Sequence, residues 1–115
     1  MRGATTVARD DGDEIVAATT ALLAAMLERN GATPEALISV VFTATPDLVA
    51  AFPAAAARAL GIADVPLLCA TEIPVAGSLE RCIRVLMHLY TDRPRTELKH
   101  VYLGDARALR EDLAD

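Results

Sequence analysis

Aromatic side chains are scarce in this chain. They account for 3% of its 115 residues, and tryptophan is absent altogether. Proteins that bind nucleic acids usually combine a basic surface with aromatic side chains that stack on the bases. This chain has neither feature, since its aromatic side chains are few and its formal net charge is −5 at pH 7. The composition therefore argues against a nucleic-acid partner, and the negative charge gives no attraction to an anionic membrane surface.

Familiar catalytic and metal-binding motifs are also missing. The sequence has no P-loop, no G-x-G-x-x-G, no G-x-S-x-G and no H-E-x-x-H. Its two cysteines, Cys69 and Cys82, do not have the spacing of a metal site or a disulfide framework. His88 and His100 have no partner at a spacing that suggests a metal site or a catalytic triad. We therefore interpret both histidines as structural or surface residues.

Long apolar segments are absent as well. The first residues, 1–6, contain no apolar stretch of the kind found in secretory signals. No apolar run approaches the roughly 20 residues that span a bilayer. We therefore expect a cytoplasmic protein that does not bind membranes. The length fits a single domain over residues 1–115. Because so short a chain has little interior in which to enclose a ligand, an oligomer with sites between subunits is a reasonable expectation.

The patterns that are present predict five strands and two main helices. A helix is predicted from Asp11 to Asn30, because Asp11 and Glu14 resemble a capping box and apolar residues then recur at helical spacing. A second helix is expected over residues 46–59. Strands are predicted over residues 2–9, 36–45, 65–71, 81–90 and 99–103.

The order of these elements favours an α/β (α+β) fold. We expect a mixed sheet of about five strands with the two main helices on one face. The other face must be covered, and in so short a chain we expect another subunit to cover it. The residues from Gly104 onward are compatible with an edge strand or a short helix.

The segment 81–90 is the most informative strand. Alternate residues from Ile83 to Leu89 are apolar and predict a core face. Arg84 lies on the opposite face among mostly apolar neighbours, where its charge is costly unless an anion or a carboxylate is near. An arginine paired with an acidic residue across an interface explains this pattern equally well, so both interpretations stay open.

Three other residues each have a structural as well as a functional interpretation. Glu72 follows a strand end, a common place for site residues, although a solvated loop glutamate is the simpler interpretation. Cys69 is more often a small buried hydrophobe than a nucleophile. Tyr102 shares a strand face with His100, which is weak evidence for a function. Taken alone, these residues indicate a small α/β domain with arginines in an apolar sheet, suited to an anion.

Five stretches of the chain form a longer series. They are RGATTV (2–7), TATPDL (43–48), AFPAAAAR (51–58), RCIRVLMH (81–88) and HVYL (100–103). This series resembles the Bacillus-type chorismate mutase family in order and in spacing, and it spans almost the whole chain. The resemblance implies a homotrimer with a pseudo-barrel core and active sites in clefts between adjacent subunits. It also implies conversion of chorismate to prephenate, in aromatic amino acid biosynthesis, without a cofactor.

The resemblance also implies which residues form the site. Carried over by position, they are Arg2, Cys69, Glu72, Arg84 and Tyr102, with Phe52 and Arg58 from the neighbouring subunit and Leu109 and Arg110 closing over the pocket. Arginine suits this task because chorismate is a dianion and the guanidinium group binds carboxylates through two parallel hydrogen bonds.

The reaction that the resemblance implies is a unimolecular Claisen rearrangement, which needs no nucleophile, metal or obligatory proton transfer. Catalysis must then come from holding the compact conformer and from stabilising the charge that develops as the ether bond breaks. Arg84 is expected to donate to the ether oxygen. Arg2 with Tyr102 would hold one carboxylate, Arg58 and Arg110 would attract the other, Glu72 and Cys69 would contact the ring hydroxyl, and Phe52 would supply an apolar wall.

Two alternatives remain beside this interpretation. One is a different enzyme on the same trimeric plan, such as the imine deaminases of the RutC-like group. The other is a non-catalytic module that binds a metabolite in the cleft between subunits.

Overall fold

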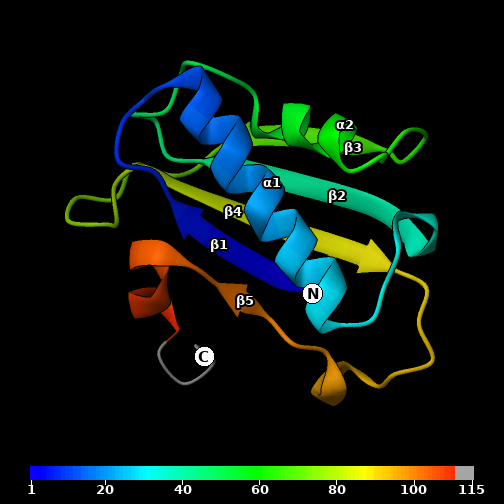
Figure 1. The fold of residues 1–115 in the computed structure, drawn as a ribbon. Helices are drawn as coiled ribbons and strands as arrows, with labels where there is room; N and C mark the ends of the chain where they lie inside the picture. Colours follow the sequence, from blue (N-terminus) through cyan, green and yellow to red (C-terminus); the bar gives the residue numbers. More distant parts are fainter. Residues whose placement is uncertain (111–115) are drawn as a thin grey trace.

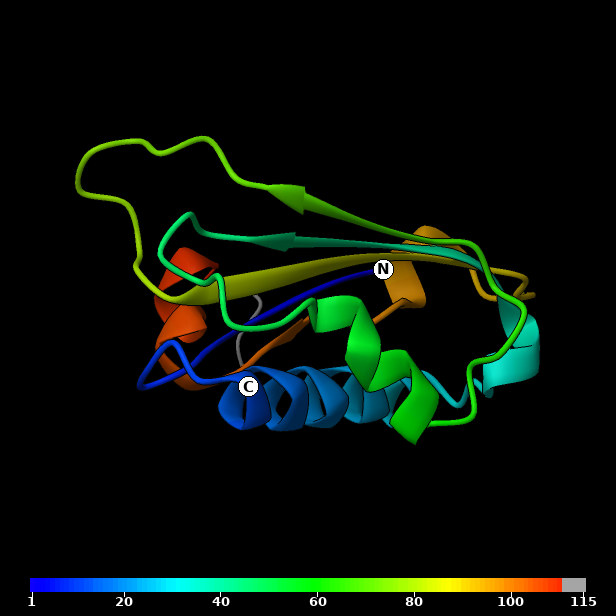
Figure 2. The ribbon, with the colours of Figure 1, turned by 90° about the horizontal axis from the view of Figure 1, so that it is seen from above.

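The computed structural model describes residues 1–110, which form a five-stranded mixed sheet with helices packed against it (Figure 1). The strand order across the sheet is β3-β2-β4-β1-β5. In the view turned by 90°, α1 and α2 lie together on one side of the sheet (Figure 2). The prediction of a mixed sheet of about five strands with two main helices on one face is confirmed.

The elements follow one another in the expected order. The strands are β1 (Arg2–Thr6), β2 (Leu37–Ala44), β3 (Leu67–Thr71), β4 (Cys82–Leu89) and β5 (Val101–Tyr102). The α-helices are α1 (Gly12–Arg29) and α2 (Ala56–Ala59), and the 3₁₀ helices are η1 (Pro34–Ala36), η2 (Pro53–Ala55), η3 (Arg95–Glu97) and η4 (Gly104–Leu109). Strand β4 runs antiparallel to β1 and β2, whereas the pairs β2–β3 and β1–β5 are parallel. Of the two alternatives for the residues after Gly104, the short helix is the one observed.

The first strand is shorter than the predicted range 2–9. It stops at Thr6 because the chain then turns toward α1, with the Val7 N–H bonded to the Arg81 carbonyl at 3.0 Å. The turn ends at Asp11, whose carboxylate caps α1 by accepting from the Glu14 N–H at 3.0 Å. The capping interpretation of Asp11 is therefore confirmed, although the Glu14 side chain pairs with Arg9 instead.

The expected second helix over residues 46–59 is wrong in its first half. Residues 46–52 form turns and bends, in which the Asp10 carboxylate accepts the N–H groups of Val49 and Ala50, both at 3.0 Å. A side chain distant in sequence thus uses the backbone donors that a helix would need. Helical structure begins only at Pro53, since proline lacks an N–H and has a fixed φ that suits the first position of a helix.

The helix-facing side of the sheet forms the core. One row of residues crosses all five strands on this side: Cys69, Phe42, Val85, Gly3 and Val101. Helix α1 lies so close to this row that a Cβ atom at Gly3 would be 2.5 Å from the sulfur of Met26. The close approach explains why glycine occupies the middle of a strand there.

The opposite side of the sheet carries a second row across all five strands. Its members are Ala70, Thr43, Arg84, Ala4 and Tyr102. A neighbouring row on the same side contains Leu68, Val41 and Leu86, of which Leu68 is 62% exposed and Leu86 42% exposed. Large apolar side chains thus remain accessible on this face within residues 1–110, as expected if something else covers it.

Asn30 links the end of α1 to the segment that leads into β5. Its buried side-chain amide donates to the carbonyls of Met26 at 2.8 Å and Lys99 at 2.9 Å. Its side-chain oxygen accepts from the Lys99 N–H at 2.7 Å. These three bonds fix the start of a strand that has only two residues of its own, and that strand carries Tyr102.

Candidate active site

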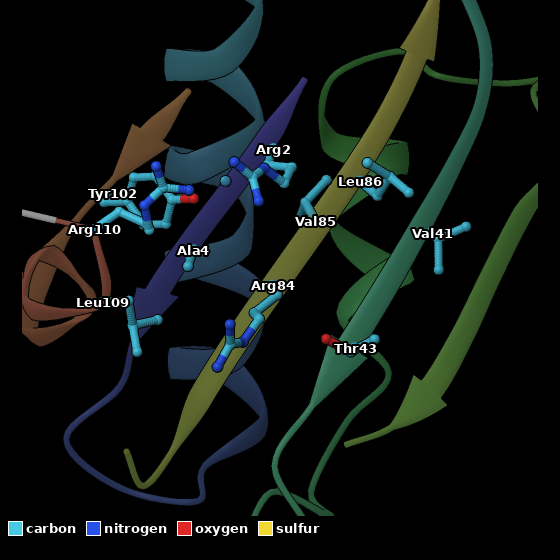
Figure 3. Close-up of a pocket in the computed structure, with 11 residues that line it drawn as sticks. Arg2, Ala4, Val41, Thr43, Arg84, Val85, Leu86, Tyr102, Leu109 and Arg110 are labelled. Atoms are coloured by element: carbon cyan, nitrogen blue, oxygen red, sulfur yellow. The ribbon is translucent and has the colours of Figure 1, made fainter. Parts of the chain in front are cut away.

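The open face of the sheet holds a cavity of about 370 Å³ that we name the arginine cavity (Figure 3). Its lining residues come from β1, β2, β4, β5 and the end of η4: Arg2, Gly3, Ala4, Val41, Thr43, Arg84, Val85, Leu86, Tyr102, Leu109 and Arg110. Five of the residues expected at the site therefore line one cavity: Arg2, Arg84, Tyr102, Leu109 and Arg110. The other expected residues, Phe52, Arg58, Cys69 and Glu72, are not among its lining residues. Three guanidinium groups thus gather at one cavity although the net charge of the chain is negative.

Arg84 is held at this cavity by Glu72. The Arg84 Nε lies 3.1 Å from Glu72 Oε2, and the same oxygen accepts from the Thr43 hydroxyl at 2.7 Å. The Glu72 side chain is 16% exposed and the Arg84 side chain 47% exposed. The Glu72 backbone is fixed as well, because its N–H donates to the Ala44 carbonyl at 3.0 Å. Glu72 thus borders the arginine cavity through its ion pair with Arg84.

Arg2 enters the cavity from the first residue of β1. Its backbone N–H donates to Nδ1 of His100 at 2.9 Å. Burial lowers the pKa of His100, and the positive charges of Arg2, the Met1 amino group and Arg110 lower it further. The ring is therefore neutral at physiological pH, with Nδ1 available as an acceptor. His100 supports the strand end that carries Arg2.

The remaining wall of the cavity comes from β5 and η4. Tyr102 is buried in an apolar cluster with Ala4, Cys82 and Ala106, against which Leu109 packs. Helix η4 can approach β1 because Gly104 has a φ of +57°, and a Cβ atom there would be 2.9 Å from the Thr6 hydroxyl oxygen. This packing places Leu109 and Arg110 along the β5 side of the arginine cavity (Figure 3).

Phe52, Arg58 and Cys69 lie elsewhere on the same chain. Phe52 is 75% exposed and borders two further hollows, one shared with Cys69 and Thr71 and another shared with Arg58 and Leu67. Cys69 belongs to the helix-facing row of the sheet, whereas Glu72 pairs with Arg84 on the opposite face. A single chain therefore brings Cys69 together with Phe52, and not with Glu72.

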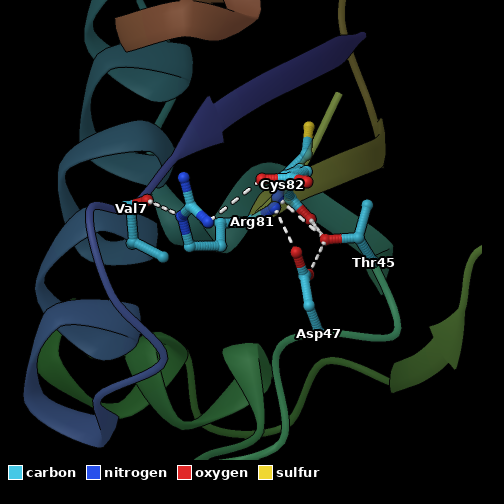
Figure 4. Close-up of polar contacts among 6 residues, drawn as sticks. Val7, Thr45, Asp47, Arg81 and Cys82 are labelled. Carbon is cyan, nitrogen blue, oxygen red and sulfur yellow. Dashed lines mark hydrogen bonds and ion pairs between the residues drawn. The ribbon is translucent and has the colours of Figure 1, made fainter. Parts of the chain in front are cut away.

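A polar network fixes the start of β4 just before Arg84 (Figure 4). The Thr45 hydroxyl accepts from the Cys82 N–H at 3.0 Å and donates to Asp47 at 2.6 Å, while the other Asp47 oxygen accepts from the Arg81 N–H at 2.9 Å. Burial acts to raise the pKa of Asp47, but the hydrogen bonds from Thr45 and Arg81 outweigh it and the pKa is lowered. Arg81 itself adopts a left-handed φ of +46°, which these contacts hold in place.

Two kinds of feature are absent from residues 1–110. No group of three or more His, Cys, Asp or Glu side chains is arranged to hold a metal ion. No helix in this part of the chain combines the length and the apolar character needed to cross a membrane.

Comparison with known proteins identifies the family of this chain. The family model for chorismate mutase type I matches residues 1–113. This chain belongs to the type I chorismate mutase family. The chorismate mutase AroH of Thermus thermophilus is 53% identical over 114 residues, covering 98% of this chain and 93% of the relative. The chorismate mutase AroH of Bacillus subtilis (strain 168) is 46% identical over 115 residues, covering 99% and 91% respectively.

A solved structure agrees with this assignment to the chorismate mutase family. A chorismate mutase from Clostridium thermocellum superimposes with a TM-score of 0.93 at 53% identity, covering 94% of this chain and 96% of that one. The resemblance seen in the sequence is therefore confirmed. The imine deaminase and binding-module alternatives are set aside by the same matches.

One residue of this candidate site, Thr43, was missed by sequence reasoning. Thr43 lies in an apolar strand where any β-branched residue would satisfy the pattern, so its hydroxyl gave no signal before its contact with Glu72 was seen. The interpretation of His100 as a structural or surface residue is confirmed, because its Nδ1 accepts the Arg2 N–H where β1 and β5 pair in parallel.

The buried thiol of Cys82 should be unreactive in the folded mutase. Burial raises the pKa of Cys82 to about 11, although the charge of Arg84 opposes the shift. At pH 8 the thiolate share should therefore be about 100-fold smaller than in an unfolded chain, and alkylation should slow by at least that factor. Mass spectrometry after iodoacetamide treatment, with and without urea, measures both rates. Equal rates in the two conditions would contradict the expectation.

Proposed function

We propose that this chorismate mutase converts chorismate to prephenate in a cleft shared by two copies of the chain within a homotrimer. One observation supports the shared cleft above all. The arginine cavity holds Arg2, Arg84 and Arg110, whereas Phe52 and Arg58 border separate hollows of the same chain. A second copy of the chain would complete the site if the surface around its Phe52 and Arg58 packed against the arginine cavity.

The arginines would bind the substrate through its two carboxylates. Arg2 and Tyr102 would hold one carboxylate, because both line the same side of the arginine cavity. Arg110 and the neighbour's equivalent of Arg58 would attract the other from the open side. Guanidinium groups suit this task because they bind carboxylates through two parallel hydrogen bonds. The exposed Phe52 ring would then become an apolar wall.

Arg84 would act on the bond that breaks. In the rearrangement the ether C–O bond opens while a C–C bond forms within the same molecule, and negative charge grows on the ether oxygen. Arg84 uses Nε to pair with Glu72, so its two terminal nitrogens carry the donors that can meet this charge. A donor that is already in place stabilises the transition state more than the substrate, which raises kcat.

Glu72 and Cys69 would contact the ring hydroxyl from different subunits. Glu72 belongs to the arginine cavity through Arg84, and its second carboxylate oxygen has the lone pairs to accept from a hydroxyl. Cys69 borders the hollow of Phe52, so we place it in the site together with the neighbour's Phe52 and Arg58. This assignment changes the expectation that Cys69 and Glu72 enter the site from one chain.

The trimer would also cover the apolar residues of the open face. Leu68, Val41 and Leu86 form a row beside the arginine cavity, and a neighbouring subunit would remove them from water as the pseudo-barrel closes. The proposal treats residues 1–115 as one domain. It also includes a cytoplasmic location, which fits two cysteines that remain thiols.

Turnover by the purified chain tests the proposal directly. Chorismate absorbance should fall after the enzyme is added, and it should fall much faster than in a matched sample without enzyme. Analytical ultracentrifugation of the same sample should give the mass of three chains. No turnover by an intact trimer at micromolar concentration would reject the function, and a stable, active monomer would reject the shared site.

A further inference from the structure

We propose that Thr43 is a positioning residue that orients the Arg84 guanidinium through Glu72. The inference rests on the role proposed for Arg84 and adds a third member to the Arg84–Glu72 pair. Thr43 on β2 lies directly opposite Arg84 on β4 and lines the arginine cavity. Its hydroxyl donates to Glu72 Oε2 at 2.7 Å, and Arg84 Nε lies 3.1 Å from the same oxygen.

The Thr43 bond determines which way the Glu72 carboxylate turns. The terminal torsion of a glutamate is broad and roughly two-fold, so a carboxylate with one partner has considerable freedom to rotate. The Thr43 hydrogen bond and the ion pair with Arg84 both act on Oε2 and remove much of that freedom. The Glu72 side chain is mostly shielded from solvent, which strengthens a hydrogen bond made there compared with one in water.

The orientation of Glu72 in turn decides which nitrogens of Arg84 face the substrate. A freely rotating carboxylate could take both a terminal nitrogen and Nε of Arg84 in a two-bond arrangement, which would turn donors away from the cavity. With Oε2 held on the Thr43 side, the ion pair uses Nε. The terminal nitrogens then keep the orientation that meets charge growing on the ether oxygen, so the hydroxyl of Thr43 acts on kcat more than on substrate binding.

Packing alone does not require this hydroxyl. Valine matches threonine in size and in β-branching, and it suits a strand at least as well. Thr43→Val therefore removes the donor with little change in shape, and Thr43→Ser keeps the donor while removing a methyl group. Thr20→Val is a matched control, since the Thr20 hydroxyl donates to the Val16 carbonyl within α1.

The test compares kcat and KM across these variants. Thr43→Val should lower kcat about tenfold with KM changed less than about twofold, and Thr43→Ser should stay within about threefold of the starting enzyme. Thr20→Val should change neither value. In a Glu72→Ala background, Thr43→Val should cost less than about twofold, because the group through which Thr43 acts is gone.

Three results would overturn the role of Thr43. The first is an unchanged kcat for Thr43→Val, and the second is a loss of kcat in Thr43→Ser equal to that in Thr43→Val. The third is a full tenfold loss of kcat when Thr43→Val is added to Glu72→Ala, because that result would indicate a merely structural contribution. Should Thr43→Val fail to assemble, Thr43→Ala is measured in the same two backgrounds with the same criteria. Arg84→Ala is assayed alongside. If it loses activity while Thr43→Val does not, this inference fails and the proposed function stands.

Discussion

Arg84→Ala is expected to lower kcat by about 100- to 1,000-fold, the usual loss when one donor aimed at a developing negative charge is removed. The expectation follows from the position of Arg84 at the arginine cavity, held by Glu72 with a separation of 3.1 Å. Arg84→Lys should keep more activity than Arg84→Ala, because a positive charge remains although the forked geometry is lost. Steady-state assays of chorismate consumption measure all three enzymes.

The control for this loss is an arginine outside the site. Arg9 has a highly exposed side chain and pairs with Glu14 at the start of α1. Because exposed ion pairs contribute little to stability, Arg9→Ala should leave both folding and turnover nearly unchanged. Full activity in a folded, assembled Arg84→Ala enzyme would show that the proposed electrostatic role is wrong, even with the function correct.

Mixing two inactive variants should restore activity if the site is shared between subunits. Arg84→Ala damages the arginine cavity, and Arg58→Ala damages the surface beside Phe52 that we assign to the neighbouring subunit. When equal amounts are unfolded and refolded together, random assembly gives an intact combination at about a quarter of the sites in a closed symmetric trimer. The mixture should therefore regain about a quarter of the original kcat, far above either variant alone.

The same experiment separates a shared site from one contained in a single chain. Refolding each variant by itself provides the baseline, and mixing the folded variants without unfolding provides a control for subunit exchange. Activity of the refolded mixture equal to the average of the two separate variants would contradict a site between subunits. Sedimentation of the mixture at the mass of three chains is needed for the interpretation.

The alternating pattern of β4 predicted both its core face and the placement of Arg84. Strand periodicity is exactly two, so once Ile83 and Val85 are assigned to the core, Arg84 must point the other way. The assignment of Glu72 to the Arg84 side could not follow from periodicity, because Glu72 lies beyond the end of β3. That assignment came from the family resemblance, and the 3.1 Å separation agrees with it.

Other features depended on contacts between residues far apart in sequence. Residues 46–52 have the composition of a helix, but the Asp10 carboxylate takes two of their backbone donors. Nothing in the local sequence signals that interaction. The separation of Cys69 from Glu72 depends on which face of β3 packs against the helices. Thr43 was hidden for a different reason, since a threonine in a strand is ordinarily explained by its β-branched shape alone.

The row that crosses the open face also constrains how this enzyme can change in length. Thr43, Arg84 and Ala4 are direct neighbours in one register on three adjacent strands. Inserting or deleting a single residue within β4 would shift its pairing by one position and turn Arg84 toward the helices. Relatives that differ in length should therefore carry their insertions in the loops that follow β3 and β4, where an added residue leaves the Arg84 side chain on the open face.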